Sequence, residues 1–194
     1  MRKLPTEFEN PFDNYLLDIS DYTVPYFYKV GFTPNTITTF SNIATILVII
    51  LLLNARYNWA AFFVLVAYFF DCADGHMART YNMTTIFGDY YDHISDTIKT
   101  TFILITLYYI DPNKFSKILP LFIIMTVALL IHMGCQELYY DSNESPTLAV
   151  NKILCPIEKD DKPMLEKVIK STRLFGCGTY QLLLAIIIIY YGFD

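Results

Sequence analysis

Residues 57–110 comprise YNWAAFFVLVAYFF (57–70), DCADGHMARTYNMTTIFGDYYDHISD (71–96) and TIKTTFILITLYYI (97–110), an acidic middle between two apolar runs. The middle stretch holds five aspartates and a single basic side chain of the Lys or Arg type, Arg79. Each flanking run is shorter than the roughly 20 apolar residues that a transmembrane helix needs. We therefore predict that both helices continue into the acidic stretch, which puts carboxylates at membrane depth.

The whole chain has the composition of a membrane protein. Hydrophobic residues make up 54% of its 194 residues and charged residues 17%, against roughly 25% charged residues in soluble domains. Residues 30–55 carry no charge, and further apolar runs cover 118–136 and 174–193. We predict an all-α integral membrane protein, a bundle of five to six transmembrane helices preceded by an interfacial amphipathic helix. The expected spans are about 35–54, 57–79, 87–110, 117–138 and 172–193, within a transmembrane catalytic domain covering 35–194.

The N-terminal segment, residues 1–34, mixes Phe, Tyr and Leu with acidic residues. This mixture is typical of a helix that lies in the membrane interface. Two roles remain open for it, anchoring the chain or admitting lipid to a site. The connection 137–173 is the least membrane-like part after the N-terminus, and its segment 147–157 is too short to cross the membrane independently, although it could be re-entrant.

The distribution of basic residues predicts the orientation. Alternating spans put ten Lys and Arg residues on the side of the acidic stretch and three on the other. Because basic residues concentrate in cytoplasmic segments, we expect the acidic stretch to face the cytoplasm. In a eukaryote, the membrane would be the endoplasmic reticulum or another biosynthetic membrane.

Net charge and cysteine content exclude other classes of protein. The net charge is −5 and the pI is about 5.1, so there is no basic face for nucleic acid. The four cysteines are scattered and form no C-x-x-C pair. We therefore expect neither a zinc site nor a disulfide framework, and we interpret the cysteines as small buried hydrophobic residues.

The spacing of the aspartates places them on helix faces. From Asp71 to Lys99 the charges sum to −3, so either some carboxylates are protonated or cations bind. At about 100° per residue, Asp71 and Asp74 share a side of one helix. Asp92 and Asp96, four residues apart, share a side of the next helix. Antiparallel packing of the two helices would bring four carboxylates into one pocket. All-oxygen ligation suits hard divalent cations, Mg²⁺, Mn²⁺ or Ca²⁺, and two such ions can support phosphoryl transfer from a bound diphosphate.

The acidic stretch also resembles the signature of the CDP-alcohol phosphotransferase family, D-x2-D-G-x2-A-R-x8-G-x3-D-x3-D. All eight fixed positions match: Asp71, Asp74, Gly75, Ala78, Arg79, Gly88, Asp92 and Asp96. Thr33-Pro34-Asn35 also resembles the entrance to that family's first helix. The resemblance covers residues 30–138 well and the remainder loosely. The family usually has six spans, whereas five are evident here.

The resemblance implies an integral membrane enzyme of phospholipid synthesis that transfers a substituted phosphoryl group from a CDP-linked donor to an alcohol and releases CMP. It implies two Mg²⁺ or Mn²⁺ ions, and a homodimer. The metal ligands would be Asp71, Asp74, Asp92 and Asp96, with Asp92 and Asp96 as catalytic residues. The candidate substrate-binding residues are Gly75, Ala78, Arg79, Gly88, Asn35 and Lys99.

Several assignments stay open at this point. Asp96 is either a ligand of the second metal ion or the base that deprotonates the attacking hydroxyl. Lys99 is either a counter-ion for Asp96 or a group that binds the acceptor's phosphate or carboxylate. Asp89 matches no fixed position, and we expect it to cap the first turn of its helix.

The substrates are open as well. ADGHMAR followed by FG resembles enzymes that use CDP-diacylglycerol, which the short chain also favours, whereas DHISD resembles the choline and ethanolamine phosphotransferases. The alternative from another class is a cation or proton transporter that uses the same acids. A transporter accounts for the charges but not for the glycines, Ala78 and Arg79 at their spacing.

Overall fold

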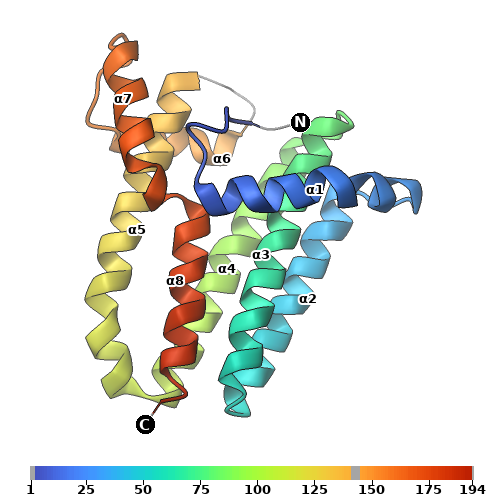
Figure 1. Ribbon diagram of the computed structural model, residues 1–194, viewed down its shortest axis with the longest axis vertical. Helices are drawn as coiled ribbons and strands as arrows, with labels where there is room; N and C mark the ends of the chain where they lie inside the picture. The colour runs from blue at the N-terminus through green and yellow to red at the C-terminus, as the bar shows by residue number, and fades with distance from the viewer. Residues whose placement is uncertain (1–2, 141–144, 194) are drawn as a thin grey trace.

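The computed structural model describes residues 3–140 and 145–193 and consists of helices joined by short connections, with no strand in these ranges (Figure 1). The helices are α1 (Pro11–Lys29), α2 (Pro34–Leu53), α3 (Tyr57–Thr80), α4 (Ile86–Ile110), α5 (Pro112–Tyr140), α6 (Pro146–Ala149), α7 (Lys162–Thr172) and α8 (Cys177–Tyr190). Two short 3₁₀ helices, η1 (Val150–Leu154) and η2 (Arg173–Phe175), flank α7.

Helices α2, α3, α4, α5 and α8 run along the length of the molecule, and α1 lies across one end of them (Figure 1). Four segments are long and apolar enough to span a membrane: Pro34–Leu53, Tyr57–Thr80, Pro112–Tyr140 and Lys162–Tyr190. The remaining helix of the bundle, α4, carries the later aspartates in its first half and Lys99 near its middle, which lowers its hydropathy. The bundle packs on a buried apolar core that includes Val48, Leu107 and Leu184. The predicted all-α membrane fold is thus confirmed.

The start of α2 shows how local sequence sets a helix boundary. Thr33 accepts a hydrogen bond from the Thr36 backbone N–H, and Pro34 occupies the first turn. A capping hydroxyl satisfies a backbone N–H that has no partner within the helix, and proline has no such group to lose. The helix entrance predicted at Thr33-Pro34-Asn35 is confirmed.

The N-terminal helix α1 is held to the bundle at its own N-terminus. Asn10 caps α1 and also donates from Nδ2 to the Arg173 carbonyl and to Thr179 Oγ1. Asp13 accepts hydrogen bonds from the Tyr68 hydroxyl at 2.6 Å and from the Gly178 backbone N–H at 3.3 Å. A Cβ atom at Gly178 would lie 2.2 Å from Asp13 Oδ1, so any larger residue there would displace the Asp13 carboxylate.

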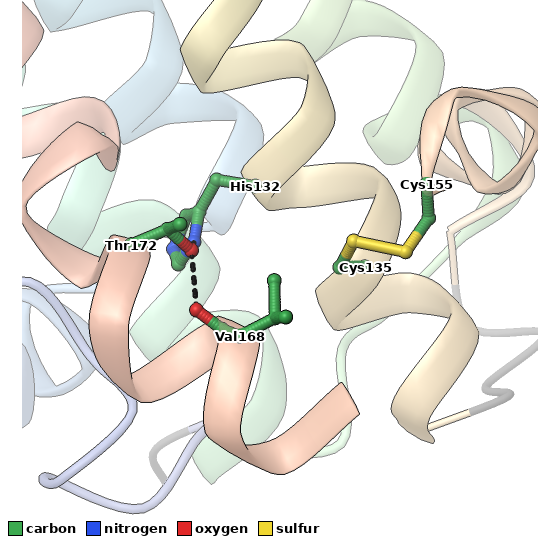
Figure 2. Close-up of a disulfide and its surroundings, with 5 residues drawn as sticks. All are labelled: His132, Cys135, Cys155, Val168 and Thr172. Carbon is green, nitrogen blue, oxygen red and sulfur yellow. Dashed lines mark hydrogen bonds between the residues drawn. A yellow bond between two sulfur atoms is a disulfide. The ribbon is translucent and has the colours of Figure 1, made fainter. Parts of the chain in front are cut away.

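The cysteine prediction was wrong for one pair. Cys135 on α5 and Cys155, which follows η1, form a disulfide across 20 residues of sequence (Figure 2). The connection folds back along α5 because Gly134 has no side chain, and a Cβ there would lie 2.2 Å from the Asn151 carbonyl oxygen. Spacing along the chain carries no sign of this contact. Cys72 and Cys177 are free thiols.

Candidate active site

Three aspartates from two helices converge at the end of the bundle that α1 crosses. Asp71 and Asp74 on α3 and Asp92 on α4 offer carboxylate oxygens that all lie within 4.8 Å of one another. Asp74 is buried, and Asp92 Oδ1 is shielded from solvent with no hydrogen-bond partner among the residues described. Buried acceptor oxygens without donors are costly unless a cation fills the space between them. The donor set therefore fits a hard divalent cation.

These carboxylates face a cavity of about 310 Å³. Asp96, Gly75, Ala78, Gly88 and Asn35 line the same cavity as the three aspartates, and so does Arg79. Every residue expected at the site from the sequence thus borders one space, except Lys99. The cavity is of the size that holds a small ligand or the head of a larger one.

The small residues of the motif leave room beside the aspartates. A Cβ at Gly75 would lie 3.2 Å from Arg79 Nη1, so the guanidinium packs over the glycine. A Cβ at Gly88 would lie 3.2 Å from the Asn35 side-chain oxygen. The planar guanidinium is suited to bidentate contact with phosphate oxygens.

Two hydroxyl groups on α2 support the aspartates, and sequence reasoning missed both. The Thr38 hydroxyl donates to Asp74 Oδ2, and Ser41 Oγ accepts from Lys99 Nζ at 2.8 Å. Both are buried, with Thr45 on the same face. Their spacing of three and four residues within an uncharged span was a usable signal, because polar groups buried in a membrane helix need partners on the next helix.

Lys99 lies behind the aspartates. Its Nζ is 2.6 Å from Asp71 Oδ1 and 2.7 Å from Asp96 Oδ1. The contact with Asp71 is a hydrogen bond, whereas the contact with Asp96 is an ion pair outside hydrogen-bond geometry. The geometry matches the counter-ion alternative.

Asp89 does not cap its own helix. Thr85 is the N-cap of α4, and its side chain accepts from the Gly88 N–H. The Asp89 carboxylate accepts from the hydroxyls of Ser145 and Thr147 and from the Thr147 backbone N–H. It therefore joins α4 to the start of α6. Asp89 does lie in the first turn of α4, as predicted, but the capping role was wrong because its partner Thr147 lies 58 residues away in sequence.

The N-terminal segment contributes two acids that sequence reasoning did not place at the site, Glu9 just before α1 and Asp13 in its first turn. Glu9 and Asp13 line the cavity. Burial raises the pKa of Glu9 to about 7, with the nearby Asp13 carboxyl adding to the effect. Burial likewise raises the pKa of Asp13 to about 6, although the Tyr68 hydrogen bond opposes the rise. The start of α1 and the residue before its N-cap are thus part of the cavity wall, and whether the segment anchors the chain or admits lipid stays a prediction.

The CDP-alcohol phosphatidyltransferase family model matches residues 32–153, which include helices α2 to α6 and the five aspartates of the stretch 71–96. The chain belongs to this family. Comparison with curated proteins and with solved structures found no significant match.

Membership of the CDP-alcohol phosphatidyltransferase family makes the protein a membrane-bound phosphotransferase of phospholipid synthesis. The transporter alternative gains no support, since the match covers the helices that carry the acids. The family's substrates are a CDP-linked donor and an alcohol acceptor, and its members work in contact with membrane lipid.

Proposed function

We propose that this enzyme transfers a substituted phosphoryl group from a CDP-linked lipid precursor to an alcohol hydroxyl, with release of CMP. The observation that carries the proposal is the convergence of Asp71, Asp74 and Asp92 on a cavity that Arg79 also borders. Carboxylates for divalent cations and a guanidinium for phosphate are the groups that a diphosphate ester needs.

The four motif aspartates would hold two divalent ions, Mg²⁺ or Mn²⁺. When bound, such ions neutralise a diphosphate and stabilise the charge on its departing oxygen. Asp71, Asp74 and Asp92 would supply one set of ligands, and Asp96 would contribute to the second ion or take the proton of the attacking hydroxyl. The shielded Asp92 Oδ1, without a donor in the described part of the chain, supports this assignment.

The remaining residues of the cavity would bind and orient the donor. Arg79 would contact the diphosphate, while Gly75, Ala78 and Gly88 would leave space for the cytidine and its phosphates. Asn35 lies beside Gly88 and would contact the donor from α2. In the reaction, the acceptor oxygen bonds to the phosphorus that carries the lipid or amino-alcohol group. The bond from that phosphorus to CMP breaks, and CMP keeps the electron pair.

CDP-diacylglycerol is the favoured donor, and CDP-choline or CDP-ethanolamine is the second candidate. The FG that follows ADGHMAR supports the first and DHISD the second. The proposal further places the active site on the cytoplasmic face, from the ten-to-three distribution of basic residues. We also propose that the enzyme is a homodimer and that its catalytic domain begins near residue 35.

The test is CMP release by purified protein. CDP-diacylglycerol or CDP-choline is mixed with a panel of alcohols and with Mg²⁺ or Mn²⁺, and CMP is quantified by chromatography. We expect CMP from one donor class, dependence on the divalent ion, and loss of CMP release in Asp92→Asn. Asp160→Asn, an exposed carboxylate in the connection before α7, is the matched control. No CMP from any pair, or full activity in Asp92→Asn, would overturn the proposal.

A further inference from the structure

Lys99 is a buried amine with an oxygen close to its Nζ from each of three residues. Its side chain is 9% exposed, and its Nζ lies 2.6 Å from Asp71 Oδ1, 2.7 Å from Asp96 Oδ1 and 2.8 Å from Ser41 Oγ. A lysine ammonium has three donors. The amine is therefore held in place by α2, α3 and its own helix α4 at once.

The position of Lys99 separates it from the substrate cavity. Lys99 is absent from the lining of the 310 Å³ cavity, whereas Asp71 and Asp96 border it. Lys99 instead borders a separate space of about 20 Å³ behind those two aspartates, which is room for about one water molecule. A direct contact with an acceptor does not fit this position.

The same arrangement divides the four aspartates into two groups. Asp71, Asp74 and Asp92 have mutually close oxygens, and Asp96 is outside that cluster. The Asp96 side chain is 44% exposed, so it is shared between the cavity and the lysine. One divalent ion can be held by the cluster while the Lys99 amine forms an ion pair with Asp96 and a hydrogen bond with Asp71 at the edge of the cluster.

The charge balance of the site determines how many divalent cations the four aspartates can hold. Four carboxylates carry four negative charges, and Lys99 with one divalent cation supplies three positive charges. A second divalent cation then meets only one remaining negative charge, which is unfavourable at a partly desolvated site. The diphosphate of a CDP-linked donor brings a negative charge on each phosphate and reverses this balance.

From this geometry we infer that Lys99 is a positioning residue that orders metal loading. It restrains Asp96 so that the free enzyme holds one divalent cation and takes the second together with the donor's diphosphate. This inference rests on the proposed function, because it assumes that the aspartates hold metal ions.

The test measures Mn²⁺ binding without turnover. Free Mn²⁺ is quantified by electron paramagnetic resonance while purified protein is titrated with MnCl₂, in the absence and presence of CDP as a non-reacting diphosphate. For the unmodified protein we expect one Mn²⁺ per chain without CDP and two with saturating CDP. In Lys99→Met the second Mn²⁺ should bind without CDP, with its affinity raised about tenfold or more, because a competing positive charge beside Asp96 is gone.

The controls separate positioning from a general effect on folding. Lys99→Arg keeps the charge and should retain the dependence on CDP. Lys117→Met, at an exposed lysine near the start of α5, should leave both stoichiometries unchanged. Where Lys99→Met does not fold, Ser41→Ala removes one of its anchors and should weaken the CDP dependence in the same direction.

Two results would overturn the inference: two Mn²⁺ bound by the unmodified protein without CDP, or unchanged binding in the folded Lys99 and Ser41 variants. Failure of the proposed function is a different result. If Mn²⁺ binding follows the expected order but no donor yields CMP, the transferase assignment fails while the role of Lys99 stands.

Discussion

The hydroxyl of Thr38 on α2 donates a hydrogen bond of 2.5 Å to Oδ2 of Asp74 on α3. Both groups are buried, so this bond determines which way the Asp74 carboxylate points. Residues that hydrogen-bond to a metal ligand fix its orientation, and their loss typically lowers metal affinity about 10–100-fold.

Thr38→Val should therefore lower Mn²⁺ affinity about 10–100-fold and reduce CMP release at sub-saturating Mn²⁺. Valine keeps the shape of threonine but donates no hydrogen bond. Thr38→Ser keeps the hydroxyl and should bind Mn²⁺ like the unmodified protein. Equal Mn²⁺ affinity in the Val and Ser variants would show that the hydrogen bond does not position Asp74.

Asp89 should behave differently from the aspartates of the cluster. It accepts three hydrogen bonds from the start of α6, so Asp89→Ala should lower the free energy of unfolding by about 1–3 kcal/mol. Mn²⁺ affinity should change little, because Asp89 is outside the three-aspartate cluster. Thermal unfolding in detergent and Mn²⁺ titration measure the two effects. A large loss of Mn²⁺ affinity with unchanged stability would make Asp89 a metal ligand instead.

Glu9 should make stability depend on pH. Because its pKa in the folded protein is raised to about 7 from an ordinary value of 4.5, the folded state binds the proton more tightly than the unfolded state does. The folded protein thus loses stability as pH rises from about 4.5 to about 7, where the buried carboxyl ionises.

Glu9→Gln should remove this loss. The variant should unfold at a higher temperature than the unmodified protein at pH 8, by an amount corresponding to about 1–3 kcal/mol, and the difference should shrink toward pH 5. Asp18→Asn, at an exposed position of α1, is the control. A difference that is the same at pH 5 and pH 8 would contradict the role of ionisation.

The Cys135–Cys155 disulfide should contribute to the stability of the fold, and its oxidation state should report the orientation of the protein in the membrane. The bond closes 20 residues of chain, so reduction, or replacement of both cysteines by serine, should cost about 2–4 kcal/mol. Thermal unfolding with and without reductant measures this cost, with the double serine variant as the control that reductant should not affect.

The oxidation state in intact cells tests the predicted orientation. The cytosol keeps thiols reduced, so a cytoplasmic site should contain both cysteines as thiols that are alkylated on rapid lysis. The pair should then close during purification without reductant. A disulfide already present in intact cells would place this end of the bundle on the opposite side of the membrane.

Local sequence alone predicted the membrane helices and the grouping of aspartates on each of two helices. Apolar runs of about 20 residues must form helices in a bilayer, because their backbone groups have no other partners there. The aspartates of each helix were predicted together because spacings of three and four residues put them on one helix face, which requires no knowledge of the rest of the fold.

Only the tertiary structure decided what surrounds those aspartates. Thr38 is 36 residues from Asp74, and Asp89 is 58 residues from its partner Thr147. The Cys135–Cys155 bond and the entry of Glu9 into the cavity likewise join segments that are distant in sequence. Such contacts depend on how the helices pack, and helical periodicity shows which face a residue occupies but not which residue of another helix it meets.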